Sequence, residues 1–203
     1  VRTVRLRGRY MQEAVPVGQG AMAAILMLDA ALVDEACREA AQGEVVSAAN
    51  LNCPGQIVIA GSVAGVDRAI AACTAKGARR AIKLPVSAPF HCALMKPAEV
   101  RLQADFAALS FTDASTPLYR NVDGEPQSAA AALRAGLVSQ VSLPVQWQKT
   151  LESMARDGFD TFIEVGAGTV VSGLVKKTLK SARTLNVEDP ASLDKTLQAL
   201  RSA

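Results

Sequence analysis

The chain has 203 residues, of which half are hydrophobic and a fifth are charged; this composition is typical of a folded globular protein and excludes an intrinsically disordered one. Its formal net charge of +3 is too small to indicate a nucleic-acid partner. The four cysteines are widely spaced without a C-x-x-C pair, so they fit neither a metal site nor a disulfide framework, and we expect reduced thiols in a cytoplasmic protein. No apolar run approaches the roughly 20 residues that cross a bilayer, so we expect no membrane span.

The first residues follow an amphipathic helical pattern, with apolar side chains at Val1, Val4, Leu6, Tyr10 and Met11. No capping residue stands before this pattern. We therefore expect that the chain continues a longer protein and that further residues precede Val1.

From Gly20 onward, strand-like and helix-like segments alternate. Asp29 is expected to cap the first helix and Gly77 to end the second. The predicted order is β-α-β-β-α-β, which over residues 18–87 is the split βαβ or ferredoxin-like arrangement. Its elements are the strand 21–28, the helix 31–41, the strands 45–52 and 56–62, the helix 63–76 and the strand 79–86.

The remaining residues predict more helix and fewer strands, with Asp189 as the cap of the last helix. Strands that alternate with helices indicate a parallel sheet. We therefore predict an α/β protein in which a larger body, residues 1–17 and 88–203, is interrupted by the small subdomain 18–87. The elements expected in this part are the helix 97–109, the strand 117–121, the helices 128–138 and 145–157, the strand 159–165, a helix from the turn at 166–168 to about 180, the strand 183–187 and the helix 190–201.

His91 is the only histidine of the chain, and it follows a predicted strand and a proline-containing turn. Its ordinary pKa, about 6.5, suits proton transfer near neutral pH, and α/β proteins place working residues at strand ends. From the residues alone, a structural histidine remains the alternative. The adjacent Cys92 is a poor partner because neighbouring side chains point in different directions.

Two other motifs fail on their spacing. The segment from Gly61 to Gly65 contains a serine, but its glycines do not fit the G-x-S-x-G nucleophile elbow, so no nucleophile is visible. Gly166 and Gly168 follow a strand and open a helix, yet the next glycine is Gly173, which does not fit the dinucleotide-binding fingerprint. We interpret these glycines as residues that ease a tight strand-to-helix turn.

Six ordered segments together resemble the malonyl-CoA:acyl carrier protein transacylases of bacterial type II fatty acid synthesis, and the resemblance covers essentially the whole chain. It implies an acyltransferase enzyme with an α/β-hydrolase-like body and a ferredoxin-like inserted subdomain. It also implies a cytoplasmic monomer without a cofactor of its own, whose partners are malonyl-CoA and acyl carrier protein. The segments are Arg7–Gln12, Gly20–Ala24, Asn50–Gly61, Ala88–His91, Pro144–Trp147 and Glu164–Gly168.

The resemblance implies a ping-pong reaction in which a serine takes the malonyl group from coenzyme A and passes it to the phosphopantetheine thiol of the carrier protein. His91 matches the general base, and the main-chain carbonyl of Gln140 matches the group that orients the imidazole. The family's G-H-S-x-G serine and its oxyanion segment would both precede Val1. We therefore expect this chain to be the C-terminal two-thirds of such an enzyme, without its nucleophile.

The resemblance also assigns substrate contacts. Arg7 matches the arginine that binds the free carboxylate of malonate, a role that suits a planar guanidinium; the residues alone favour a solvated helix face, and Arg2, Arg5 and Arg9 are left to that interpretation. Asn50 and Asn52 alternate on one strand face and suit hydrogen bonds to pantetheine, with a turn-forming role as the alternative. Phe90 resembles the malonyl-selective version of the family, in which bulk discourages an α-methyl branch.

The basic residues Lys76, Arg79, Arg80 and Lys83 form a group that could steer an acidic carrier protein, with a solvated basic turn as the alternative. Two further functions stay open. One is an acyltransferase domain of a polyketide synthase, and the other is a catalytically inactive fragment or carrier-binding module.

Overall fold

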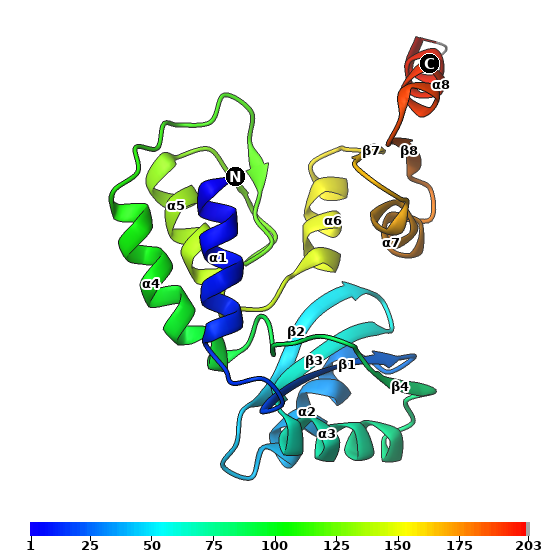
Figure 1. The fold of residues 1–203 in the computed structure, drawn as a ribbon. Helices are drawn as coiled ribbons and strands as arrows, with labels where there is room; N and C mark the ends of the chain where they lie inside the picture. The colour runs from blue at the N-terminus through cyan, green and yellow to red at the C-terminus, as the bar shows by residue number, and fades with distance from the viewer. Residues whose placement is uncertain (202–203) are drawn as a thin grey trace. The chain divides into compact units, whose positions relative to one another are not determined.

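The computed structural model describes residues 1–201 and shows a mixed α/β protein, as predicted (Figure 1). The chain divides into two compact units, the first from Val1 to Thr150 and the second from Leu151 onward. The predicted subdomain boundaries after residues 17 and 87 lie inside the first unit and stay a prediction. Within residues 1–201, no helix combines the length and apolar character needed to cross a membrane.

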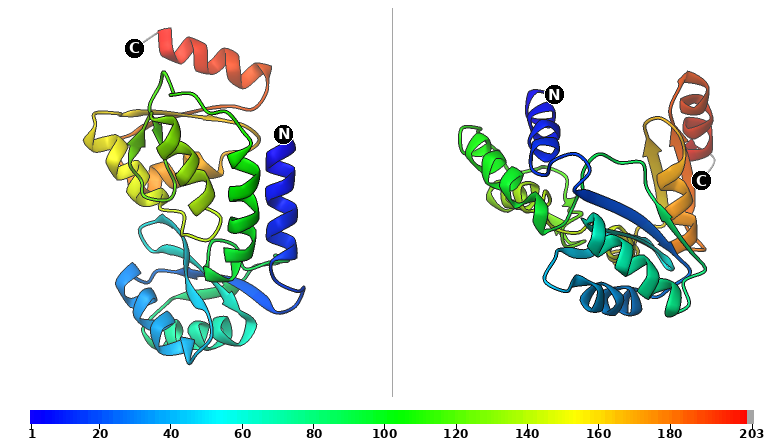
Figure 2. Two further views of the ribbon diagram at one scale, coloured as in Figure 1. Left: turned by 90° about the vertical axis from the view of Figure 1, so that its left-hand side faces the viewer. Right: turned by 60° about the horizontal axis from the view of Figure 1, so that its bottom comes forward.

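A four-stranded antiparallel sheet forms one part of the first unit, in the order β2-β3-β1-β4. Two helices, α2 (Ala30–Ala41) and α3 (Val63–Ala75), cover one face of this sheet (Figure 2). Alternate strand residues such as Ile25 and Ile59 point to these helices and are fully buried, as the period of two requires. The strands are β1 (Gly20–Leu26), β2 (Val46–Cys53), β3 (Gln56–Ser62) and β4 (Arg80–Lys83).

The ends of these elements follow local chemistry. Ser62 accepts a hydrogen bond from the backbone N–H of Gly65 at 3.0 Å. The serine of the Gly61–Gly65 segment, which does not fit the nucleophile elbow, is therefore the N-cap of α3. Gly77 has a φ of +99° and ends α3 as predicted. Asp29 occupies the N-cap position of α2, but the expected capping bond from its side chain is not made. Strand β4 is shorter than the predicted 79–86 because Pro85 has no N–H to extend the pairing.

The helical part of the first unit consists of α1 (Arg2–Glu13), α4 (Lys96–Ala107) and α5 (Ala130–Ser139). The short helix η1 (Ala93–Met95) directly precedes α4. In both views α1 and α4 lie side by side (Figures 1 and 2). Tyr10 and Met11 are buried in their shared core, whereas Val1 and Val4 are exposed. Only the second half of the predicted apolar face is therefore covered.

The predicted strand 117–121 does not join a parallel sheet. It forms the two-residue strand β5 (Leu118–Tyr119), which pairs antiparallel with an unpredicted β6 (Pro126–Gln127). A turn at Asp123-Gly124, in which Gly124 has a φ of +71°, brings the two strands together. An Asp-Gly pair is typical of a hairpin turn. It accounts for the antiparallel pairing found here in place of the expected parallel sheet.

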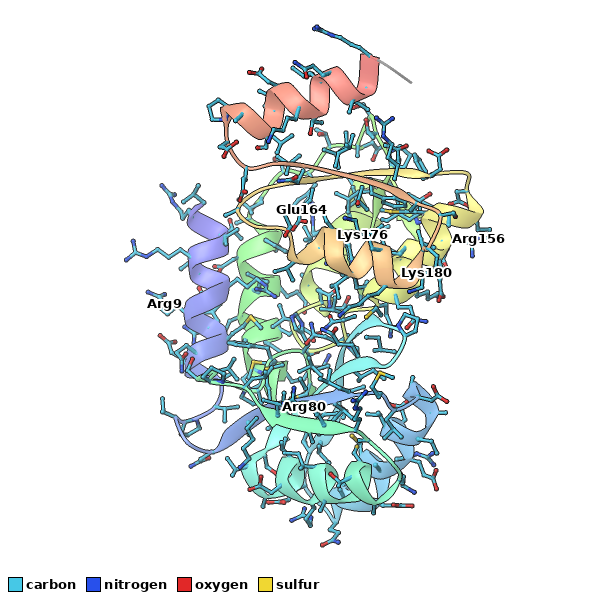
Figure 3. The ribbon with its side chains drawn as sticks, turned by 90° about the vertical axis from the view of Figure 1, so that its right-hand side faces the viewer. Arg9, Arg80, Arg156, Glu164, Lys176 and Lys180 are labelled. Carbon is cyan, nitrogen blue, oxygen red and sulfur yellow. The ribbon has the colours of Figure 1, made fainter. Side chains whose placement is uncertain are left out.

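The second unit contains the predicted parallel pairing, between β7 (Thr161–Val165) and β8 (Arg183–Val187). Helix α6 (Trp147–Arg156) leads into this unit, α7 (Val170–Thr178) connects the two strands, and α8 (Pro190–Arg201) ends it. Glu164 lies at the N-terminal end of α7 and accepts from the backbone of Val171 and Ser172 at 3.0 and 2.7 Å (Figure 3). Bonds from the Ser172 side chain and backbone hold the pKa of this carboxyl below its ordinary value.

The ends of the second unit's other elements also match their predicted roles. Gly166 and Gly168 have φ values of +146° and +81°, which is the tight strand-to-helix turn expected from these glycines. Asp189 caps α8 by accepting from the backbone of Ser192 at 2.7 Å. The Glu-Val-Gly-Ala-Gly segment is therefore explained by helix initiation.

Candidate functional site

His91 lies in a strained turn between β4 and η1. Its φ is +59°, a left-handed value that is uncommon for a residue with a side chain and that clusters at functional sites. The turn is held in place by its neighbours, because Ala88 and Cys92 are fully buried. Buried neighbours thus hold His91 half-buried in a backbone conformation that residues with a side chain adopt only rarely.

A main-chain carbonyl faces the imidazole of His91. Nδ1 of His91 lies 2.8 Å from the carbonyl oxygen of Gln140, which follows the last residue of α5. A carbonyl only accepts hydrogen bonds, so in the neutral ring the proton is on Nδ1. The lone pair of Nε2 is therefore left available to take a proton from another group.

The surroundings keep this imidazole neutral at physiological pH. Burial lowers the pKa of His91 below its ordinary 6.5, and the positive charge of Arg7 lowers it further. The carbonyls of Gln140 and Leu143 act in the opposite direction but are outweighed. The result is a base that is unprotonated and oriented before any substrate arrives.

Arg7 differs from the other arginines of α1. It is half-buried, and burial lowers the pKa of its guanidinium, whereas Arg2, Arg5 and Arg9 are exposed. Arg9 projects from the helix and pairs with Glu13 at 3.7 Å (Figure 3). Within residues 1–201, no carboxylate pairs with Arg7. A half-buried guanidinium without a counter-charge, close enough to His91 to affect its pKa, is suited to bind an anionic ligand.

A bulge in β2 places Asn50 on the face of the sheet that carries the neighbours of His91. Ala48 pairs with Ile59 and Asn50 with Val58, so two residues of β2 oppose one of β3. Val58 belongs to a core cluster with Cys92, and directly paired residues share a face. Asn50 therefore lies on the face of the sheet against which Cys92 packs. A second irregularity next to Asn52 breaks the simple alternation expected for the two asparagines.

Phe90 and Leu94 connect two parts of the first unit. Both are partly buried and pack against the core between the helices as well as against the core beneath the sheet. Packing alone therefore accounts for the position of Phe90, and its predicted role in substrate selection stays a prediction.

Cys92 is excluded as a nucleophile by its surroundings. Its thiol is buried and donates to the carbonyl of Pro89 at 3.1 Å. Burial raises the pKa of the thiol to about 11, so the reactive thiolate is scarce at neutral pH. This agrees with the expectation that His91 and Cys92 form no dyad.

The four basic residues near β4 do not form one free patch. Lys76 pairs with Glu35 and Glu39 at 3.1 and 3.0 Å, and Lys83 pairs with Asp67 at 2.6 Å. Arg79 and Arg80 pair with no carboxylate within residues 1–201. With Leu26 and Met27 these two arginines line a hollow at the end of the sheet, and Figure 3 shows Arg80 on β4.

Sequence reasoning missed how the loop after α5 is anchored. The backbone N–H of Val145 donates to Ala49 at 2.8 Å, and the N–H of Leu51 donates to Val145 at 2.9 Å, so this loop pairs with β2. The loop that orients His91 is thus joined to the strand that carries Asn50. No local pattern signals a pairing between residues that lie so far apart in the chain.

Comparison with known proteins agrees with this geometry. The acyl transferase domain family matches residues 1–198. The chain is 48% identical over 198 residues to the malonyl CoA-acyl carrier protein transacylase of Escherichia coli (strain K12), covering 98% of this chain and 64% of that protein. The chain thus spans less than two-thirds of the length of the curated relatives it matches.

Solved structures give the same result. An acyl carrier protein S-malonyltransferase from Vibrio cholerae superposes with a TM-score of 0.95 at 45% identity, covering 96% of this chain and 64% of that one. A malonyl-transacylase in complex with a type II polyketide synthase acyl-carrier protein also superposes with a TM-score of 0.95 at 45% identity, covering 98% and 64%.

Proposed function

Because the chain belongs to the acyl transferase domain family, we propose that its protein transfers a malonyl group from malonyl-CoA to the phosphopantetheine thiol of an acyl carrier protein. The relatives named for this reaction support the proposal. The observation that carries it is the unpaired, half-buried guanidinium of Arg7 beside a neutral His91. One group suits the free carboxylate of the acyl chain, and the other suits proton transfer at its thioester end.

His91 acts as general base and then as general acid. Its Nε2 takes the proton of a serine hydroxyl while the serine oxygen attacks the thioester carbon, and the tetrahedral intermediate then expels coenzyme A as a thiol that takes the proton from the imidazolium. The carrier thiol reverses these steps and releases the serine. The serine comes from the part of the relatives' length that this chain does not span. No cofactor takes part.

The finer fold assignment supports the same function. We infer that residues 18–87 form a ferredoxin-like subdomain, inserted into an α/β-hydrolase-like body made of residues 1–17 and 88–203, of which residues 202 and 203 lie outside the described part of the chain. The sheet order β2-β3-β1-β4 with two helices on one face supports the first part, and the parallel pair β7 and β8 supports the second. The same proposal assigns Asn50 and Asn52 to pantetheine and Phe90 to the selection of malonyl over methylmalonyl groups. Four free, buried cysteines support a cytoplasmic location.

A chimera tests the function directly. Residues 1–198 of this chain replace the matching stretch of the Escherichia coli relative, and radiolabelled malonyl-CoA is supplied with acyl carrier protein. We expect label on the chimera and on the carrier protein, and none on the present chain alone. A chimera that folds but moves no malonyl group would contradict the function, and covalent label on the chain alone would contradict the external serine. The latter outcome would also reject an inactive carrier-binding module.

The charge pattern near β4 predicts which residues steer the acidic carrier protein. In the chimera, replacing Arg79 and Arg80 by alanine should lower kcat/KM for carrier protein by several-fold, because unpaired surface charge accelerates association. The matched control replaces Lys76 and Lys83 by alanine; it should have little effect, because neighbouring carboxylates already neutralise both residues. Equal losses in the two variants would show that the pairing state does not matter. Formation of the labelled enzyme from malonyl-CoA should be unchanged in both.

A further inference from the structure

The side chain of Gln140 has a role that its main-chain contact with His91 does not explain. Its Nε2 donates to the carbonyl of Leu143 at 2.9 Å and to the carbonyl of Pro144 at 3.1 Å. An amide nitrogen has two hydrogens, so both donors are used within the turn that follows α5. The side chain therefore curls forward and closes the segment 140–144 on itself.

The orientation of this amide follows from its neighbours. If oxygen and nitrogen were exchanged, Oε1 would face two carbonyl oxygens, and three acceptors would meet without a proton between them. In the observed orientation Oε1 is buried and accepts no hydrogen bond within residues 1–201. An unpaired buried acceptor is unfavourable, so the two donated hydrogen bonds are kept although Oε1 has no partner.

The closed turn carries the contacts of the imidazole. Gln140 ends α5, so its carbonyl is free to face Nδ1 of His91 at 2.8 Å. The carbonyl of Leu143, one of the two held by the amide, also acts on the imidazole and raises its pKa. The far end of the turn is anchored, because the N–H of Val145 donates to Ala49 at 2.8 Å. The Gln140 amide is thus the internal brace between an anchored end and the carbonyl that orients the base.

We propose that the Gln140 side chain is a positioning group for His91, which holds the 140–144 turn so that the Gln140 carbonyl keeps the imidazole in its Nδ1–H tautomer. The inference rests on the proposed function only in taking His91 as the base. A variant without the side-chain amide still has the main-chain carbonyl of residue 140. That carbonyl is no longer held in one orientation toward the imidazole. The ring proton then distributes between Nδ1 and Nε2, and a ring protonated at Nε2 cannot accept the nucleophile's proton.

The chain offers a clean measurement, because His91 is its only histidine. In histidine labelled with nitrogen-15, the protonated and the bare ring nitrogen of the neutral imidazole have widely separated shifts, so the tautomer is read directly by NMR on the present chain. Wild type should show the Nδ1–H form alone above the pKa of His91. The variant Gln140→Met has similar length and no donors, and it should show a mixture of both tautomers.

Two further variants make the test decisive. Gln146→Met is the matched control, since the side chain of Gln146 forms no hydrogen bond within the described residues; it should keep the single tautomer. Gln140→Asn retains an amide but is one methylene too short to reach both carbonyls, and it replaces the methionine variant if that protein does not fold by circular dichroism. A single Nδ1–H tautomer in whichever Gln140 variant folds would overturn the proposal.

The test separates the two proposals. A tautomer mixture in the Gln140 variant together with an inactive chimera would leave the positioning role standing and reject malonyl transfer. An active chimera with an unchanged tautomer would do the reverse. In an active chimera, Gln140→Met should lower kcat several-fold with little change in KM for malonyl-CoA, because only the fraction of rings that carry the proton on Nδ1 remains productive.

Discussion

Replacing Arg7 by alanine in the chimera should lower kcat/KM for malonyl-CoA by about a hundredfold and leave acetyl transfer within about threefold of its original rate. The malonyl group ends in a carboxylate that the guanidinium binds through two parallel hydrogen bonds, and hydrogen bonds to charged groups contribute about 1.5–3 kcal/mol each. An acetyl group has no such carboxylate. Every 1.36 kcal/mol changes a rate by about tenfold, which sets the size of the expected loss for malonyl transfer. Steady-state kinetics with both thioesters measures whether the loss is specific to malonyl.

Two variants serve as controls for this result. Arg7→Lys retains the positive charge but not the two-pronged geometry, and should lie between wild type and alanine. Arg5→Ala removes an exposed arginine from the same helix and should change neither reaction. Equal losses of malonyl and acetyl transfer in Arg7→Ala would show that the guanidinium does not bind the carboxylate.

Replacing His91 by alanine removes the base and should lower kcat/KM by about 10² to 10⁴, the usual contribution of general acid–base catalysis. The pH dependence of the rate tests the same role in the chimera that retains His91. It is measured by following thioester hydrolysis or transfer at several pH values. The base works only when neutral, so the rate falls as the pH falls through the pKa of His91. Because burial and Arg7 lower that pKa, the midpoint lies below the ordinary 6.5.

The direction in which the pH profile moves in Arg7→Ala tests whether His91 is the titrating base. Arg7→Ala removes a positive charge that lowers the pKa of His91, so the acid limb of the remaining acetyl transfer should move to higher pH. The control for the base itself is Cys92→Ala, which removes the adjacent buried thiol and should retain the pH profile. An acid limb that stays in place in Arg7→Ala would contradict the proximity of the two groups.

The lowered pKa of His91 in the folded wild-type chain also affects stability. His91 binds its proton more weakly in the folded chain than in the unfolded one, where its pKa is about 6.5. Its contribution to the free energy of unfolding is therefore complete above pH 6.5 and decreases as the pH falls from there toward the folded pKa.

Local patterns predicted most of the elements because their causes are local. The bounds of β8 and α8 agree with the predicted 183–187 and 190–201, since alternation, a capping Asp189 and helical spacing all lie within a few residues of the element they define. The failures have the opposite cause. The strand 117–121 was assigned to a parallel sheet, whereas its partner β6 is decided by a turn at Gly124 and by a pairing that periodicity does not specify.

The candidate site shows the same division. The residue types that are available follow from the amino-acid sequence: one histidine, an arginine on a helix, two asparagines on a strand, and no serine in a nucleophile elbow. It is the packing of distant segments that leaves Arg7 half-buried without a counter-charge while Arg2, Arg5 and Arg9 face solvent. It likewise decided which basic residues near β4 remain unpaired.

The contact between His91 and Gln140 joins residues 49 positions apart. Its acceptor is a main-chain carbonyl, which every residue possesses. No pattern of side chains in the sequence therefore predicts this hydrogen bond. Residue type is a property of the sequence, but burial, charge pairing and the direction of a carbonyl arise only when distant segments pack together. The physical reason is that solvent exclusion and hydrogen-bond geometry depend on the whole surroundings of a group rather than on its neighbours along the chain.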